Sequence, residues 1–282
     1  MRIRKLLRVR FVVDPFTEQE KIMAELTPMM QKYMETKEQY KDCILFYRLG
    51  DFYEMFFDDA LVASRELEIT LTGKSCGLEE RAPMCGIPYH AVEGYLSKLV
   101  SRGYKVAICE QVEDPKLAKG LVKREVIRVV TPGTNLNVQS LEAGKNNYLL
   151  SIAYTPDGIG ISAADVTTGD YYVTEVEDLK KLNDELMKYE PSEIICNEAF
   201  LVSGFDVNDL KSRLHISVNA LESHMFDDDG CRRILMKHFK VNTLIGLGVE
   251  EFPTGLLAAG ALLQYLYDTQ KTDLEHFTHI RT

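Results

Sequence analysis

The chain has 282 residues, of which 45% are hydrophobic and 27% charged, and its formal net charge is −10. This composition is that of a soluble globular protein, and the length is sufficient for two ordinary domains. No apolar run approaches the roughly 20 residues of a membrane span. The basic, apolar first dozen residues lack the long apolar core and the cleavage site of a signal peptide.

Charge is divided unevenly between the two halves of the sequence. Residues 1–145 hold 22 Lys and Arg against 21 Asp and Glu, whereas residues 146–282 hold 11 against 22. Because phosphate repels an acidic surface, contact with nucleic acid is expected through the first half. The acidic second half is a better candidate for a spacer or a protein-binding module.

The six cysteines form no C-x-x-C pair, which favours reduced thiols in a cytosolic compartment. Cys76, Cys85 and His90 are close in sequence, but their spacing matches no standard zinc site and a fourth ligand is missing. No metal site is therefore expected.

The first half is interpreted as a mixed-sheet α/β domain over residues 21–132, preceded by a disordered extension at residues 1–20. Thr27 and Pro28 form a favourable helix start, as N-cap and first helical residue. Asp58 or Asp59 is expected to cap a short helix that ends at Leu67. A further amphipathic helix is expected over His90–Arg102. Strands are predicted at residues 43–49, in a hairpin within residues 68–89, at 104–111 and at 121–132.

The Gly-, Asn- and Ser-rich stretch at residues 133–146 is interpreted as a linker. Three consecutive strands follow it, and helices then alternate with strands, which is the order of a ribonuclease-H-like α/β domain over residues 147–282. The final Leu- and Ala-rich helix is predicted over Thr254–Gln270. No closing element is apparent between this helix and Thr282, which predicts a fragment of a longer protein.

The stretch GDFYEMFF, residues 50–57, crowds aromatic side chains around one acid. On a strand, Phe52 and Glu54 share one face and Tyr53 takes the other, whereas on a helix the first two would point about 200° apart. One interpretation is an ordinary strand end, with Tyr53 and Met55 packed inward and the rest solvated. The other is a wedge, in which the aromatic enters a base step and the carboxylate hydrogen-bonds the same base. Such a pair would favour DNA that is easily kinked or unpaired.

Three segments of the first half carry a family pattern: LTPMMQKYMETKEQYKDCILFYRLGDFYEMFFDDA, APMCGIPYHAVEGYLSKLVSRGYKVAICEQVEDP and REVIRVVTPGT. With the Phe-x-Glu of GDFYE, they resemble the amino-terminal mismatch-recognition domain of the MutS family of DNA mismatch-repair proteins, from about Leu26 to Thr134. Residues 146–282 resemble the family's connector domain, including AAGALLQYLYDTQK, which would run into the start of a core or lever domain.

This resemblance implies that Phe52 is the intercalating aromatic and that Glu54 hydrogen-bonds the mispaired base from the minor-groove side. It also implies a homodimer in the full-length protein and a MutL-type repair partner for the connector domain. ATP and magnesium would belong to an ATPase domain outside this sequence, so no cofactor is expected here. The implied location is the bacterial cytoplasm, in association with the nucleoid.

Further DNA contacts are expected around the wedge. The GIPYH segment, residues 86–90, lies against the wedge in the family and is interpreted as its support. Gly73-Lys74-Ser75 is not a P-loop, because Glu68 stands where the first glycine is needed. The candidate phosphate contacts are Lys74, Arg81, Lys119, Lys123 and Arg124, and the candidate minor-groove contacts are Met84 and Ile87.

Two alternatives belong to other functional classes. A ribonuclease-H-like nuclease needs clustered carboxylates for two metal ions, one of them on the first strand. The strand NYLLSIAY carries no acid, and Asp165 and Asp170 are interpreted as solvated turn residues, so the chain is not expected to be an enzyme. The other alternative is an interaction module, in which the acidic connector docks a repair partner.

Overall fold

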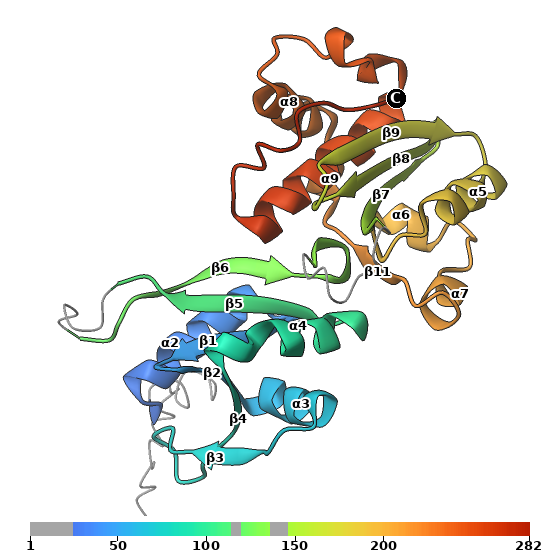
Figure 1. The fold of residues 1–282 in the computed structure, drawn as a ribbon. Helices are drawn as coiled ribbons and strands as arrows, with labels where there is room; N and C mark the ends of the chain where they lie inside the picture. Colours follow the sequence, from blue (N-terminus) through green and yellow to red (C-terminus); the bar gives the residue numbers. More distant parts are fainter. Residues whose placement is uncertain (1–24, 114–119, 136–145) are drawn as a thin grey trace, which may run out of the picture.

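Two mixed β-sheets organise the chain, one in each half (Figure 1). The computed structural model describes residues 25–113, 120–135 and 146–282. The extension expected at residues 1–20 lies outside these described residues. The mixed α/β class expected for both halves is confirmed.

The first sheet has six strands in the order β3-β4-β2-β1-β5-β6. β1 and β5 run parallel, and the other neighbours are antiparallel. The strands are β1 (Cys43–Leu49), β2 (Phe52–Phe56), β3 (Thr72–Lys74), β4 (Ala82–Pro88), β5 (Lys105–Gln111) and β6 (Arg124–Val130).

Helices cover both faces of this sheet, so its central strands are almost continuously apolar. One face packs on α3 (Phe57–Leu67) and α4 (Val92–Ser101), and the other on α2 (Pro28–Gln39). Pro28 occupies the first turn of α2, as predicted. The helix predicted to begin at His90 begins at Val92, after a 3-10 turn over Tyr89–Ala91.

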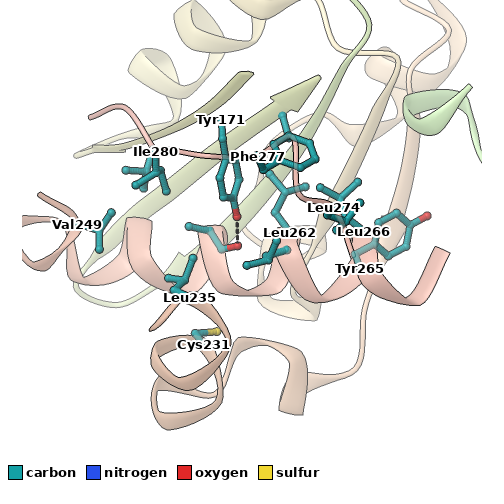
Figure 2. Packing of buried hydrophobic residues seen from close by; sticks show 14 of the residues in the cluster. Tyr171, Cys231, Leu235, Val249, Leu262, Tyr265, Leu266, Leu274, Phe277 and Ile280 are labelled. Atoms are coloured by element: carbon teal, nitrogen blue, oxygen red, sulfur yellow. Dashed lines mark hydrogen bonds between the residues drawn. The ribbon is translucent and has the colours of Figure 1, made fainter. Parts of the chain in front are cut away.

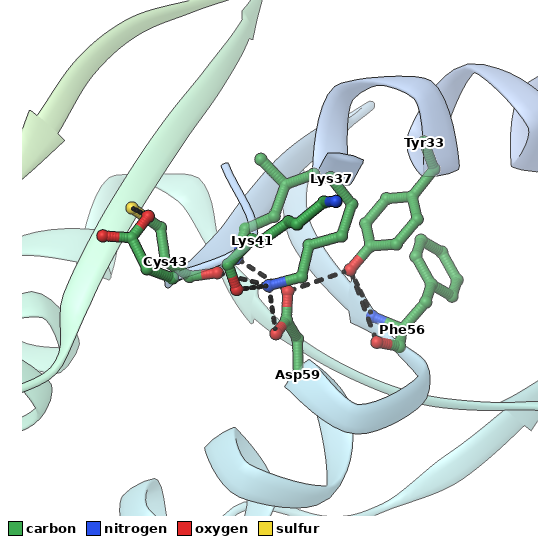
Figure 3. A network of polar contacts seen from close by, with 8 residues as sticks. Tyr33, Lys37, Lys41, Cys43, Phe56 and Asp59 are labelled. Carbon is green, nitrogen blue, oxygen red and sulfur yellow. Dashed lines mark hydrogen bonds and ion pairs between the residues drawn. The ribbon is translucent and has the colours of Figure 1, made fainter. Parts of the chain in front are cut away.

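The expected capping role of Asp58 or Asp59 is wrong, because α3 has no side-chain cap. Asp59 is buried and instead accepts hydrogen bonds from the Leu45 amide at 2.9 Å and the Tyr33 hydroxyl at 3.2 Å (Figure 3). The Lys37 ammonium lies 2.9 Å from the same carboxylate. This network joins α2, β1 and α3, and so fixes the end of β2 where the chain turns into α3.

The second sheet has five strands in the order β11-β10-β7-β8-β9. β7, β8 and β9 form an antiparallel meander, and β10 and β11 add parallel to β7. Numbered from β7, the order is 5-4-1-2-3, so the ribonuclease-H-like prediction is confirmed. The strands are β7 (Tyr148–Thr155), β8 (Gly158–Asp165), β9 (Asp170–Val176), β10 (Glu193–Cys196) and β11 (Ser217–Ala220).

α9 (Pro253–Gln270) is the central helix of the second half and packs across β7, β8 and β9 (Figure 2). The Tyr171 hydroxyl on β9 donates a hydrogen bond to the Ala259 carbonyl of α9. Gly160 permits the close approach, since a Cβ there would lie 1.9 Å from the Thr254 carbonyl oxygen. The remaining helices are α5 (Leu179–Tyr189), α6 (Glu198–Leu201), α7 (Val207–Ser212) and α8 (Asp228–Phe239).

The expectation that no closing element follows the last helix is wrong. Residues 271–282 fold back over the sheet and bury Leu274, Phe277 and Ile280. The Arg281 amide donates to the Tyr171 carbonyl at 2.9 Å, and the Arg281 carbonyl accepts from the Val173 amide at 2.8 Å. The segment is irregular apart from this bridge, which is why no strand pattern predicted it.

The chain leaves the first sheet through a 3-10 turn, Pro132–Thr134, which is closed by a capping box between Thr131 and Thr134. These residues fall at the start of the expected linker, yet Gly133 and Thr134 are buried. A Cβ on Gly133 would lie 2.8 Å from the Leu149 side chain. The turn therefore packs on the second sheet, whereas residues 136–145 of the expected linker lie outside the described residues.

Candidate nucleic-acid interface

Phe52 lies at the tip of a tight hairpin. Leu49 pairs with Phe52 across a two-residue turn, Gly50-Asp51. Gly50 has a φ of +59°, the conformation that glycine favours at the first position of such a turn. The Phe52 side chain is 47% exposed. A large aromatic side chain is thus presented to solvent at the end of a short, geometrically fixed strand.

The GIPYH segment flanks this tip. Pro88 is the partner of Phe52 in the β2–β4 pairing, and the Tyr89 amide donates to the Asp51 carbonyl at 3.0 Å. The hairpin is therefore held from the β4 side as well as from β1.

Arg48 supports the hairpin from beneath. Its guanidinium lies 3.8 Å from the ring centroid of Tyr89 and donates to the Gly50 carbonyl at 2.5 Å. It also pairs with Glu110 at 3.2 Å, and the same carboxylate accepts a hydrogen bond from the Tyr53 hydroxyl. Burial and this carboxylate raise the pKa of Tyr53, so the phenol remains a donor at neutral pH. Sequence reasoning missed Arg48, because its partners come from three different strands and turns.

The alternation predicted for GDFYEMF is present. Tyr53 and Met55 are buried among α3 and α4, while Phe52 and Glu54 share the opposite face. This arrangement is compatible with both interpretations of the motif, a wedge and an ordinary strand end.

Glu54 is held by a lysine two strands away. The Lys74 ammonium on β3 lies 2.5 Å from Oε2 of Glu54, crossing β4 to reach it. Gly86 is the β4 residue opposite Glu54, and Ala82, four residues earlier on β4, is opposite Lys74. The Glu54 and Lys74 side chains are 16% and 34% exposed. Lys74, expected to be a phosphate contact, is thus paired with the very carboxylate expected to bind the base.

The other expected DNA contacts differ in their surroundings. Arg81 is exposed, and Met84 is half-buried on the face of Phe52 and Glu54. Lys123 is exposed but pairs with Glu125 at 2.6 Å. Arg124 already has partners within the protein, since its guanidinium donates to the Arg48 carbonyl at 2.7 Å and lies 5.3 Å from the centroid of the Tyr47 ring. Lys119 lies outside the described residues.

The expected minor-groove contact by Ile87 is wrong. Its side chain is 0% exposed and lies in the core with Tyr53 and Met55. Because Met84 and Ile87 are three residues apart on one strand, their side chains must point to opposite faces. Strand parity would have excluded one of them at the sequence level.

The interpretation of Asp165 as a solvated turn residue is also wrong. Asp165 is fully buried, and its carboxylate accepts from the amides of Asn147 at 3.0 Å and Thr167 at 2.8 Å. Asp170 lies 3.2 Å from the guanidinium of Arg281. Both acids therefore have structural partners.

Within the described ranges, no group of three or more His, Cys, Asp or Glu side chains is arranged to hold a metal ion. Across the same residues, no helix is both long and apolar enough to cross a membrane. In the first half, an exposed aromatic side chain and a carboxylate thus share one face of the sheet.

Comparison with known proteins matches two successive parts of the chain to family models. Residues 27–139 match the family model described as MutS domain I, and residues 147–280 match MutS domain II. Together the two matches cover most of the sequence, and the chain therefore belongs to the MutS family.

The similar relatives include three clostridial proteins called DNA mismatch repair protein MutS. The protein of Lachnoclostridium phytofermentans is 67% identical over 258 residues, which are 92% of this chain and 28% of that protein. Those of Ruminiclostridium cellulolyticum and Acetivibrio thermocellus are 53% and 54% identical over 90% of this chain and 29% of each protein. The chain spans less than a third of the length of these curated relatives.

Proposed function

We propose that this chain recognises mispaired or unpaired bases in duplex DNA, as the first step of DNA mismatch repair. Phe52 would enter the minor groove and stack on a base, and Glu54 would hydrogen-bond that base. The observation that carries the proposal is the exposed Phe52 beside Glu54 on one face of a fixed hairpin, within the segment that matches MutS domain I.

The energetics favour damaged over intact duplex. Stacking of an aromatic side chain on a base contributes about 1–3 kcal/mol, while opening a base step costs a few kcal/mol. That cost is smallest where a base is already mispaired. Glu54 adds to the difference, because its carboxylate gains a hydrogen bond only where a base offers one.

The test is fluorescence-anisotropy titration of matched and G·T duplexes at one low salt concentration. Phe52→Ala is expected to lose most of the preference for the mismatch and to keep its residual, phosphate-driven binding. Leu61→Ala is the matched control, because Leu61 is an equally exposed apolar residue, 46% exposed, on α3. If Phe52→Ala retains the preference, the wedge fails and the strand-end interpretation holds.

The Glu54 variants separate the carboxylate from the ring. Glu54→Ala and Glu54→Gln are expected to tighten binding to matched duplex more than to mismatched duplex. Discrimination then falls because matched binding becomes stronger, whereas in Phe52→Ala it falls because mismatch binding becomes weaker. Equal weakening on both duplexes would instead make Glu54 a structural residue.

For the second half, we propose docking of a MutL-type repair partner. Its support is the excess of 22 acidic over 11 basic residues after position 145, together with the adjacent exposed side chains of Leu201 and Val202 at the end of α6. Val202→Asp should weaken capture of the purified partner by the whole chain, whereas Ile245→Asp, at another exposed apolar residue, should not. Equal capture by both variants would remove α6 from the docking surface.

The remaining features of the family are proposed for the protein to which these two domains belong. They are a homodimer, ATP and magnesium bound by a separate ATPase domain, and a location in the bacterial cytoplasm at the nucleoid. No cofactor is proposed for the two domains themselves.

A further inference from the structure

The carboxylate proposed to bind the base already has a cationic partner. The Lys74 ammonium lies 2.5 Å from Oε2 of Glu54, and both side chains are partly sheltered, at 34% and 16% exposure. Shelter from water strengthens such a pair relative to one between two exposed side chains. In the absence of DNA, Glu54 and Lys74 therefore neutralise each other.

Glu54 and Lys74 stand on the same face of the sheet, because the β4 residues opposite them are an even number of positions apart. Glu54 on β2 lies opposite Gly86 on β4, and Lys74 on β3 lies opposite Ala82 on β4. A Cβ on Gly86 would lie 3.6 Å from Cγ of Glu54, so glycine at this position leaves room for the Glu54 side chain. The Lys74 ammonium is also 5.5 Å from the centroid of the Phe56 ring. Backbone geometry thus holds the two side chains within reach of each other.

The two partners of Glu54 lie in different directions. Lys74 lies across the sheet, beyond β4, whereas Phe52 lies along β2 toward the hairpin tip. A base stacked on Phe52 would be on the tip side. A hydrogen bond from Glu54 to that base would draw the carboxylate toward the tip and lengthen its contact with Lys74.

We propose that Lys74 is a conditional phosphate contact that Glu54 releases when it binds a mispaired base. On matched duplex the carboxylate keeps the ammonium, which then neutralises no phosphate. On mismatched duplex the freed ammonium pairs with the backbone beside the wedge. The release step rests on the proposed function, whereas the holding of Lys74 by Glu54 does not.

Counterion release makes this proposal measurable. Each phosphate neutralised by a lysine adds about 0.9 to the slope of log affinity against log salt. The wild-type slope should therefore be steeper on mismatched than on matched duplex by about that amount. Between 50 and 200 mM salt, the difference corresponds to an additional loss of affinity of about threefold.

The experiment measures these slopes for five proteins on matched and G·T duplexes. They are the wild type, Glu54→Gln, Lys74→Met, the double variant, and the control Lys181→Met, which removes an exposed lysine paired with Glu177 in the second half. Methionine keeps the apolar stem of Lys74 and removes only its charge. Circular dichroism and urea unfolding of each variant check that it is folded.

On matched duplex, Glu54→Gln should steepen the slope by about 0.9, because Lys74 is then free. The double variant should return to the wild-type slope. On mismatched duplex, Lys74→Met should lose the extra slope, and Lys181→Met should behave as the wild type on both duplexes.

Two results would overturn the inference. The first concerns matched duplex: Glu54→Gln leaves the salt slope unchanged, or it steepens the slope by the same amount whether or not Lys74 is replaced by Met. Either outcome would mean that Glu54 does not hold Lys74. The other is an equal wild-type slope on both duplexes while Phe52→Ala abolishes discrimination, since the wedge then works without release. If Phe52→Ala keeps discrimination, the proposed function itself fails, and the matched-duplex comparison still decides whether Glu54 holds Lys74.

Discussion

The Tyr265 hydroxyl on α9 donates a 2.8 Å hydrogen bond to the carboxylate of Glu193 at the start of β10. The same carboxylate accepts from Nδ2 of Asn219 and from the Gly133 amide, each at 3.1 Å. Glu193 is fully buried, so these donors replace the hydration that its charge has lost. One carboxylate thereby joins the turn that leaves the first domain to the sheet and the last helix of the second.

Tyr265→Phe should therefore loosen this junction. Removing one donor from a buried charge is expected to reduce the free energy of unfolding by about 1–3 kcal/mol. The Gly133 amide should also exchange its hydrogen faster, because it shares the same acceptor. Urea unfolding and amide exchange measured by NMR check both effects. Tyr154→Phe is the control, since the Tyr154 hydroxyl makes no hydrogen bond within the described residues; an equal loss in both variants would contradict this role of Glu193.

Gly160→Ala tests the contact between α9 and β8. The added Cβ would lie 1.9 Å from the Thr254 carbonyl oxygen, a backbone atom that cannot move without shifting the helix. We expect a loss of about 2–3 kcal/mol or more in unfolding free energy. Gly246→Ala, where nothing lies within 4 Å of the added Cβ, should change stability by less than about 0.5 kcal/mol. A Gly160→Ala variant as stable as Gly246→Ala would show that the helix is seated differently.

His238 predicts a pH dependence of stability. Its Nε2 donates to the Phe277 carbonyl at 2.8 Å, and its Nδ1 lies 2.7 Å from the Tyr267 hydroxyl. Burial lowers the pKa of His238 below its ordinary 6.5; the hydrogen bond to the Phe277 carbonyl opposes this shift, and His276 and Lys240 add to it.

The unfolded chain therefore binds a proton at a higher pH than the folded chain. The stabilisation by neutral His238 is fully present above about pH 6.5 and is lost as the pH falls through the lower folded pKa. Urea midpoints measured from pH 7.5 to pH 5 should fall less steeply for His238→Gln than for the wild type. The control His279→Gln, at an exposed position, should show the same dependence of the urea midpoint on pH as the wild type. If the midpoint of His238→Gln falls as steeply as that of the wild type, other groups cause the acid sensitivity.

Nuclease activity is the remaining alternative for the ribonuclease-H-like sheet, and we expect none. The carboxylate of Asp165 is occupied by the amides of Asn147 and Thr167, and Asp170 faces Arg281. Incubation with labelled duplex, RNA–DNA hybrid and single strands, with magnesium or manganese, should leave all substrates intact. Cleavage that disappears in Asp165→Asn, with folding retained, would establish a catalytic site here.

The order of elements could be predicted from the sequence, because the strands and helices show clear periodicity and the turns contain Gly, Pro and Asp. The five-strand order of the second half followed from three strands in succession and then alternation. Elements without periodicity were missed, as the return of residues 271–282 to β9 illustrates.

The candidate site was predictable in its local part only. Alternation placed Phe52 and Glu54 on one face, since that depends on β2 alone. The pairing of Glu54 with Lys74 depends on how β2, β4 and β3 lie beside one another in the sheet. Such a contact between residues 20 positions apart has no signature in a single sequence. Asp165 was missed for the same reason, because its partner Asn147 is 18 positions away, just before β7, the strand that pairs with β8.

The central claim is that Phe52 acts by stacking, and a series of side chains at this position tests it most directly. The measurement is the ratio of affinities for G·T and matched duplexes with Trp, Phe, Leu and Ala at residue 52, at one fixed salt concentration. Stacking requires a flat aromatic face, so the ratio should stay high for Phe52→Trp, fall for Phe52→Leu although leucine is large and apolar, and approach one for Phe52→Ala. A ratio for Phe52→Leu equal to that of the wild type, or an undiminished ratio for Phe52→Ala, would contradict the account.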